Sequence, residues 1–89
     1  MKHILKQYGG VETYEASKLK LSIERTLLSC HIQDQLAQAQ AEKITDQFNI
    51  WLTPKTEITS LDIRMKITKL LIKNNKYAAI LYKNHKQLW

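Results

Sequence analysis

Cysteine and glycine are scarce in this chain of 89 residues, which has one cysteine, Cys30, and two glycines, Gly9 and Gly10. A single thiol cannot form an internal disulfide, so a disulfide-stapled secreted fold is excluded and a cytoplasmic protein is expected. Two adjacent glycines cannot build the GxxxxGK[ST] or GxGxxG loops that cradle phosphates. Both of these glycine-rich motifs are therefore excluded.

Long apolar stretches are also missing. No run approaches the roughly 20 residues of a membrane-spanning helix, and the opening MKHILKQYGG lacks the apolar stretch of a signal peptide. The hydrophobic content of 44% and the charged content of 25% are ordinary for a soluble globular protein. We therefore expect a single domain over residues 1–89, with one modest core and no membrane partner.

Acidic side chains are absent from residues 63–89, which hold seven Lys or Arg. The first 62 residues hold seven basic and eight acidic side chains, so most of the net charge of +6 comes from the last third of the chain. A cationic surface of this kind suits a nucleotide, a nucleic acid or an acidic protein face. The alternative is a solvated face that serves only solubility.

The residues that usually carry catalysis or bind metals are few and poorly arranged. The histidines and the cysteine show no metal-ligand spacing. Cys30 and His31 are neighbours in the chain, and adjacent residues rarely aim at each other. Glu12 and Glu15 are close carboxylates, but no nucleophile or metal motif accompanies them. We therefore expect a protein that is not an enzyme.

The first part of the chain predicts a β-hairpin. Residues 3–7 form a strand candidate, Tyr8-Gly9-Gly10 a turn in which glycine supplies a positive φ, and residues 11–14 a second strand with alternating apolar and polar side chains. Glu57 and Ile58 are candidates for a third short strand. Because an isolated hairpin is marginal in water, it must pack on the helices that follow.

A first helix is predicted to begin near Ser17, which is a plausible N-cap. Leu19, Ile23 and Leu27 recur every four residues and form its buried stripe. Lys18 places a cation in the first turn, where it opposes the helix dipole. An anion bound there would reverse the sign of that interaction, although a lysine that simply bends into water is the plainer interpretation.

Apolar periodicity predicts two further helices. One runs from about Asp34 to Leu52 and ends before Thr53-Pro54, since proline forbids continuation. Another spans about Lys76 to Leu88. The expected inward-facing residues are Ala37, Ala41, Ile44, Phe48 and Trp51 in the former, and Tyr77, Leu81 and Leu88 in the latter.

A helix between these two is predicted to open at Thr59, with Asp62 three residues later as in a capping box. Arg64 again places a cation in a first helical turn. If both helix starts point the same way, they would frame one polyanion site with free backbone N–H groups. Two independent caps with incidental charges are the alternative. The predicted fold class is α+β, a hairpin with a possible third strand capping a four-helix bundle.

The order of these features resembles an ATP-cone, the nucleotide-binding regulatory domain of ribonucleotide reductases and of their gene repressor. The resemblance lies in a strand with Lys6, a glycine turn, Val-Glu, an aromatic residue and Ser-Lys-Leu, then Ile-Thr-Ser-x-Asp-Ile-Arg and a closing Tyr-Ala-x-x-x-Tyr helix. It covers about residues 3–86. It implies ATP or dATP as ligand, with Mg²⁺ as a possible companion, and a switch of oligomeric state.

The resemblance also implies site residues, at the positions that match the family's pattern. Phosphate contacts would come from helix starts, and base and ribose contacts from the hairpin, with one basic residue of the last helix completing the site. The implied set is Ile4 against the adenine, Lys6 and Gln7 along the nucleotide, Glu12 near the base or ribose, Lys18, Ser60 and Arg64 at the phosphates, and Lys83 or Lys86.

Two departures from the family qualify this expectation. The turn reads Tyr8-Gly9-Gly10 where the family has Asp-Gly or Asn-Gly, and the 89 residues contain neither a reductase domain nor a zinc ribbon. The expected function is therefore a nucleotide-binding regulatory module that acts in trans, on a partner such as a ribonucleotide reductase subunit, or through homo-oligomerisation. A small basic helical module that binds nucleic acid or protein is the alternative.

Overall fold

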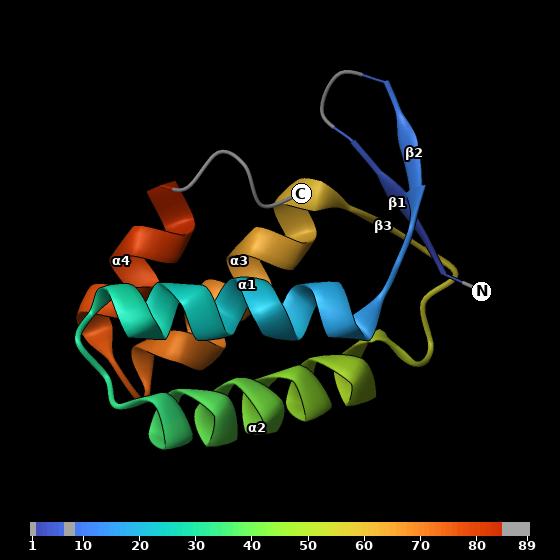
Figure 1. Ribbon diagram of the computed structural model, residues 1–89. Coiled ribbons are helices and arrows are strands. Elements are labelled where there is room, and N and C mark those ends of the chain that lie inside the picture. The colour runs from blue at the N-terminus through green and yellow to red at the C-terminus, as the bar shows by residue number, and fades with distance from the viewer. Residues whose placement is uncertain (1, 7–8, 85–89) are drawn as a thin grey trace.

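Three short strands lie at one end of four helices within residues 2–6 and 9–84, the part of the chain that the computed structural model describes (Figure 1). The α+β class expected from the sequence is thereby confirmed. The elements are β1 (His3–Leu5), β2 (Val11–Thr13), α1 (Ala16–Ser29), α2 (Asp34–Leu52), β3 (Glu57–Thr59), α3 (Ser60–Ile72) and α4 (Lys76–Asn84).

The sheet has β1 in the middle, antiparallel to β2 and parallel to β3. Ile4 lies opposite Glu12 on one side and Ile58 on the other. Directly opposed residues point to the same face of a sheet, and Ile4 and Ile58 are buried. Glu12 therefore faces the helices as well, although it is a carboxylate.

The hairpin reverses through the predicted glycine turn. The Lys6 amide donates to the Gly10 carbonyl at 2.8 Å, and the Gly9 amide donates to the Lys6 carbonyl at 3.1 Å. Gly9 has φ +93°, a conformation that residues with a Cβ rarely adopt. The glycine is thus required by the backbone at this turn, whereas the predicted Tyr8 and Gln7 lie outside the described residues.

The core lies between two helix pairs. Helix α1 packs chiefly on α2, and α3 on α4, and Figure 1 shows α3 and α4 crossing the α1–α2 pair steeply. The predicted buried stripes of α1 and α2 are confirmed, with Trp51 half-buried at the edge. The fully buried residues of this pair are Leu19, Ile23, Leu27, Ala37, Ala41, Ile44 and Phe48.

The predicted N-cap of the first helix is wrong. Helix α1 begins at Ala16, next to the predicted start near Ser17, but its cap residue is Glu15, with extended backbone and no side-chain cap hydrogen bond. Ser17 lies exposed within the first turn. A serine cap is worth only about 1 kcal/mol, and Ala16 is the strongest helix former, so the helix extends past it towards β2.

The predicted inward face of the last helix is also wrong. Tyr77 is 78% exposed and Leu81 45% exposed, whereas Ala78, Ala79 and Tyr82 are buried. Helix separation depends on the side chains at the contact, and two alanines let α4 approach its neighbours closely. The predicted continuation to Leu88 lies outside the described residues. None of the described helices has the length and apolar character needed to cross a membrane.

Helix α1 ends in a Schellman motif built on a histidine. The Ile32 amide donates to the Leu27 carbonyl at 3.2 Å and the His31 amide to the Leu28 carbonyl at 3.0 Å. His31 has φ 64° and is, among the described residues, the one non-glycine with a positive φ. Glycine usually occupies this position because a Cβ is strained there.

We therefore expect His31→Gly to raise the free energy of unfolding by about 0.5–1 kcal/mol, the strain relieved less the extra entropy of an unfolded glycine. His31→Ala is the matched control, because alanine keeps the Cβ. Urea unfolding of the three proteins measures both effects. Equal stabilisation by glycine and alanine would show that backbone strain is not the cause.

Candidate functional site

A hollow of about 480 Å³ lies where the sheet meets the start of α3. Strand β3 runs parallel to β1 and ends at Thr59, opposite Leu5. The first turn of α3 therefore begins beside the end of β1, and the hollow forms between them. Its lining residues are Leu5, Lys6, Thr59, Ser60, Leu61 and Arg64.

The start of α3 is fixed by the predicted capping box, which the structure confirms. The Asp62 amide donates to Thr59 Oγ1 at 3.0 Å, and the Thr59 amide donates to Asp62 Oδ2 at 3.2 Å. The first amides of a helix have no acceptor within the helix. Those of Ser60 and Leu61, which the box does not use, lie at the positive end of the helix dipole beside the hollow.

Two cations from different elements border this hollow. Lys6 follows the end of β1 and is half-exposed. Arg64 lies in the second turn of α3 and is half-buried. Arg64 is close enough to Tyr82 to lower the pKa of its hydroxyl, against the larger effect of burial. The hollow therefore combines a helix N-terminus with two positive side chains, an arrangement that suits an anion.

Glu12 joins two lysines at the edge of the same region. Its carboxylate pairs with Lys6 Nζ at 3.2 Å and with Lys18 Nζ of α1. Both lysine side chains are about half-exposed, and exposed ion pairs are worth only about 0–1 kcal/mol. The Glu12 side chain is only 25% exposed, however, so drawing a lysine away from it leaves a partly buried carboxylate with fewer partners and costs more than breaking an exposed pair.

The structure brings together five of the residues implied by the resemblance. Lys6, Glu12 and Lys18 form the ion-pair cluster, and Ser60 and Arg64 line the hollow with Lys6. Two of the remaining residues, Ile4 and Lys83, do not join them. Ile4 is fully buried in the core and offers no surface to a base, Lys83 is exposed on α4 and does not line the hollow, and Gln7 and Lys86 lie outside the described residues.

The two helix starts do not frame one site together. Strand β2, which leads into α1, ends at Thr13 opposite His3, whereas β3 ends at Thr59 opposite Leu5. The helices therefore leave opposite ends of β1, and only the start of α3 lines the hollow. Lys18 reaches the region through its contact with Glu12 instead.

Leu5 and Leu61 are lining residues that sequence reasoning missed. Leu5 is 37% exposed and Leu61 60% exposed, so both present apolar surface at the hollow. The sequence could have indicated that Leu61 is exposed, because it lies outside the periodic stripe of buried apolar residues in α3. Leu5 could be assigned only once the parallel pairing of β1 with β3 was known.

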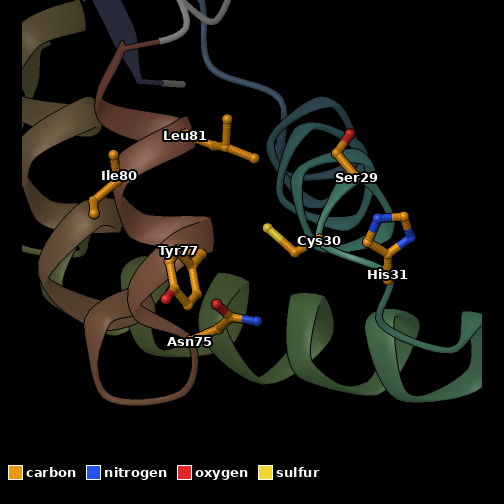
Figure 2. Close-up of a pocket in the computed structure, with 7 residues that line it drawn as sticks. All are labelled: Ser29, Cys30, His31, Asn75, Tyr77, Ile80 and Leu81. Atoms are coloured by element: carbon orange, nitrogen blue, oxygen red, sulfur yellow. The ribbon is translucent and has the colours of Figure 1, made fainter.

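A second hollow, of about 450 Å³, lies between the end of α1 and α4 (Figure 2). Figure 2 shows the Cys30 thiol pointing towards α4, with the His31 ring turned away from it. The interpretation of Cys30 as a structural residue without a catalytic imidazole beside it agrees with this geometry. Within residues 2–6 and 9–84, no three His, Cys, Asp or Glu side chains gather as a metal site would require.

Comparisons of this chain with protein-family models, with curated proteins and with solved structures found no match.

Proposed function

We propose that this protein is a non-enzymatic regulatory module that binds an adenine nucleotide, ATP or dATP, in the hollow between β1 and α3. The observation that carries the proposal is the convergence of Lys6, Arg64 and the first turn of α3 on that hollow. The choice of adenine rests on the resemblance to the ATP-cone family.

A polyphosphate fits this hollow on physical grounds. Helix N-termini bind phosphate through backbone amides and the dipole, and the net charge of +6 would attract a nucleotide from solution. The volume of about 480 Å³ falls within the roughly 300–1,000 Å³ of small-molecule sites. Leu5 and Leu61 supply the apolar surface that a base needs.

Binding would change the ion pairs of the hairpin. Lys6 and Lys18 both form ion pairs with Glu12. A phosphate that takes over Lys6 would break the Lys6–Glu12 ion pair and alter how β2 rests on α1. A ligand shifts a conformational equilibrium by its difference in affinity for the two states. This rearrangement is the step through which nucleotide would control a partner, such as a reductase subunit, or self-association.

Isothermal titration with ATP, dATP and GTP tests the proposal. We expect an adenine nucleotide to bind at micromolar concentration or tighter, and Lys6→Ala to weaken that binding by about 1.5–3 kcal/mol, as for a hydrogen bond to a charged group. Lys43→Ala, which removes an exposed lysine of α2, is the matched control. The absence of binding heat, or an equal effect of the two substitutions, would contradict the proposed site.

Nucleic-acid binding is the second candidate, favoured by the basic side chains of α3 and α4 and the absence of acidic ones from residues 63–84. It predicts DNA or RNA binding without nucleotide, falling steeply with salt. A gel shift run beside a thermal shift with ATP distinguishes the two functions, because only the nucleotide module is stabilised by ATP.

A further inference from the structure

The solvent face of α3 carries large apolar side chains among lysines. Met65 is 52% exposed and Ile72 54% exposed, and Lys69 is exposed between them. Residues seven apart in a helix lie on one face. Met65 and Ile72 therefore lie on a different face of α3 from the buried residues Ile63 and Ile67. Within the described residues, their apolar surface stays exposed.

Trp51 of α2 extends this surface. A shallow hollow of about 210 Å³ is lined by Trp51, Asp62, Met65, Lys66 and Lys69. The Lys55 ammonium lies 4.2 Å from the centroid of the indole ring and the Lys66 ammonium 5.5 Å from it. We refer to Trp51, Met65, Lys66, Lys69 and Ile72 as the Trp51 face.

The charge around the Trp51 face is almost entirely positive. Lys66 and Lys69 belong to it, and Lys55 borders it. The acidic side chain at its hollow is Asp62, and its carboxylate already accepts a hydrogen bond from the Thr59 amide. A partner that neutralises these lysines and also covers Met65 and Ile72 must combine carboxylates with apolar side chains.

We propose that the Trp51 face binds an acidic amphipathic segment of a partner protein, with apolar side chains over Met65 and Ile72 and carboxylates at the lysines. A nucleic acid fits less well. Single strands bind by stacking bases on exposed rings, but here two ammonium groups lie over the indole and Phe48 packs beside it at 5.4 Å between centroids. A phosphate backbone would also leave Met65 and Ile72 in water.

The test uses a fluorescein-labelled synthetic peptide of leucine and glutamate at amphipathic helical spacing, with fluorescence anisotropy as the readout. A peptide with lysine in place of glutamate and an oligothymidylate are the comparison probes. We expect the acidic peptide to bind and the lysine peptide not to bind. Stronger binding of the oligothymidylate than of the acidic peptide, or no binding of the acidic peptide, would overturn the proposal.

Two pairs of variants locate the binding. The double substitution Lys66→Glu and Lys69→Glu should lower the affinity for the acidic peptide by about tenfold or more, because complementary charge is lost. Lys43→Glu with Lys76→Glu has the same net charge and should change affinity less than about twofold, since both lysines are exposed elsewhere. Met65→Ser should weaken binding severalfold, whereas Ile50→Ser, at a residue 74% exposed on α2, should not. Equal losses within either pair would refute the assignment to this face.

Discussion

Phe48→Ala is expected to lower the free energy of unfolding by about 3–5 kcal/mol, the range for large aromatic residues truncated in a core. Phe48 is fully buried, and its ring lies 5.8 Å from that of Tyr14 and 5.4 Å from that of Trp51, measured between centroids. Truncation therefore removes both the buried ring and two aromatic contacts.

The cost extends beyond α2, because this cluster attaches the hairpin to the helices. Tyr14 follows β2, and its hydroxyl donates to Asn49 Oδ1 at 2.6 Å. Loss of the Phe48 ring leaves Tyr14 with weaker packing at its hydrogen-bonding position. We therefore expect Phe48→Ala to disturb the hairpin as well as the core.

Urea unfolding, followed by circular dichroism, measures the effect. Ile50→Ala is the matched control, because Ile50 belongs to the same helix but is 74% exposed, and surface substitutions usually change stability by less than about 0.5 kcal/mol. A loss below about 1.5 kcal/mol for Phe48→Ala would mean that the ring is not part of a close-packed core.

The second large effect is a loss of stability in alkaline solution, caused by Tyr82. Burial raises the pKa of Tyr82 to about 12, an effect opposed by its hydrogen bond with Ser22 and by the charge of Arg64. Tyr82 is 1% exposed, and its hydroxyl lies 3.3 Å from Ser22 Oγ. In the unfolded chain a tyrosine titrates near pH 10.

Below pH 10 both the folded and the unfolded states keep the Tyr82 proton, so Tyr82 contributes no pH dependence to the free energy of unfolding. Between pH 10 and about 12 the unfolded chain loses the proton and the folded protein keeps it, so stability falls by roughly 1.4 kcal/mol per pH unit, or about 3 kcal/mol in all. Tyr14 acts in the same direction, since burial, with a smaller contribution from Tyr82, raises its pKa to about 12.

Comparison with Tyr82→Phe separates this effect from the titration of lysines and from the larger, burial-caused part of the raised Tyr14 pKa. At pH 8 the variant should be less stable by about 1 kcal/mol, the usual worth of a hydrogen bond. That deficit should disappear and reverse as the pH rises from 10 to 12. Urea midpoints of the two proteins that stay parallel across this range would show that Tyr82 is not a buried neutral hydroxyl.

Local sequence signals predicted the helices well. The four-residue spacing of Leu19, Ile23 and Leu27, the extent of α2 and the Thr59–Asp62 capping box all depend on residues within a few positions of each other, and all are confirmed. Apart from the Ser17 cap, which is a local error, the wrong predictions concern tertiary contact. Whether Tyr77 or Tyr82 faces inward depends on how closely the alanines of α4 let it approach its neighbours, which no local pattern records.

The candidate site depends more than the helices do on contacts between residues far apart in the sequence. The residues implied by family resemblance included Lys6 and Arg64, but their common hollow exists because β3 pairs with β1 in parallel. The ion pairs of Glu12 with Lys6 and Lys18 likewise require the hairpin register and the path of α1. Charge patterns indicate that cations are available, and only the fold determines which of them meet.

Because β1 is synthesised first yet lies between its two neighbours, the sheet cannot close until residue 59 has been made. The helix pairs are built from segments that are close in the chain, whereas β1 pairs with β3 across a much longer loop. Because closing a long loop costs entropy, we expect the pairing of β1 with β3 to form late in folding. A ligand bound in the hollow contacts both β1 and the start of α3, so it would stabilise the closed pairing of β1 with β3. It would prolong the lifetime of the closed domain far more than it would hasten its formation.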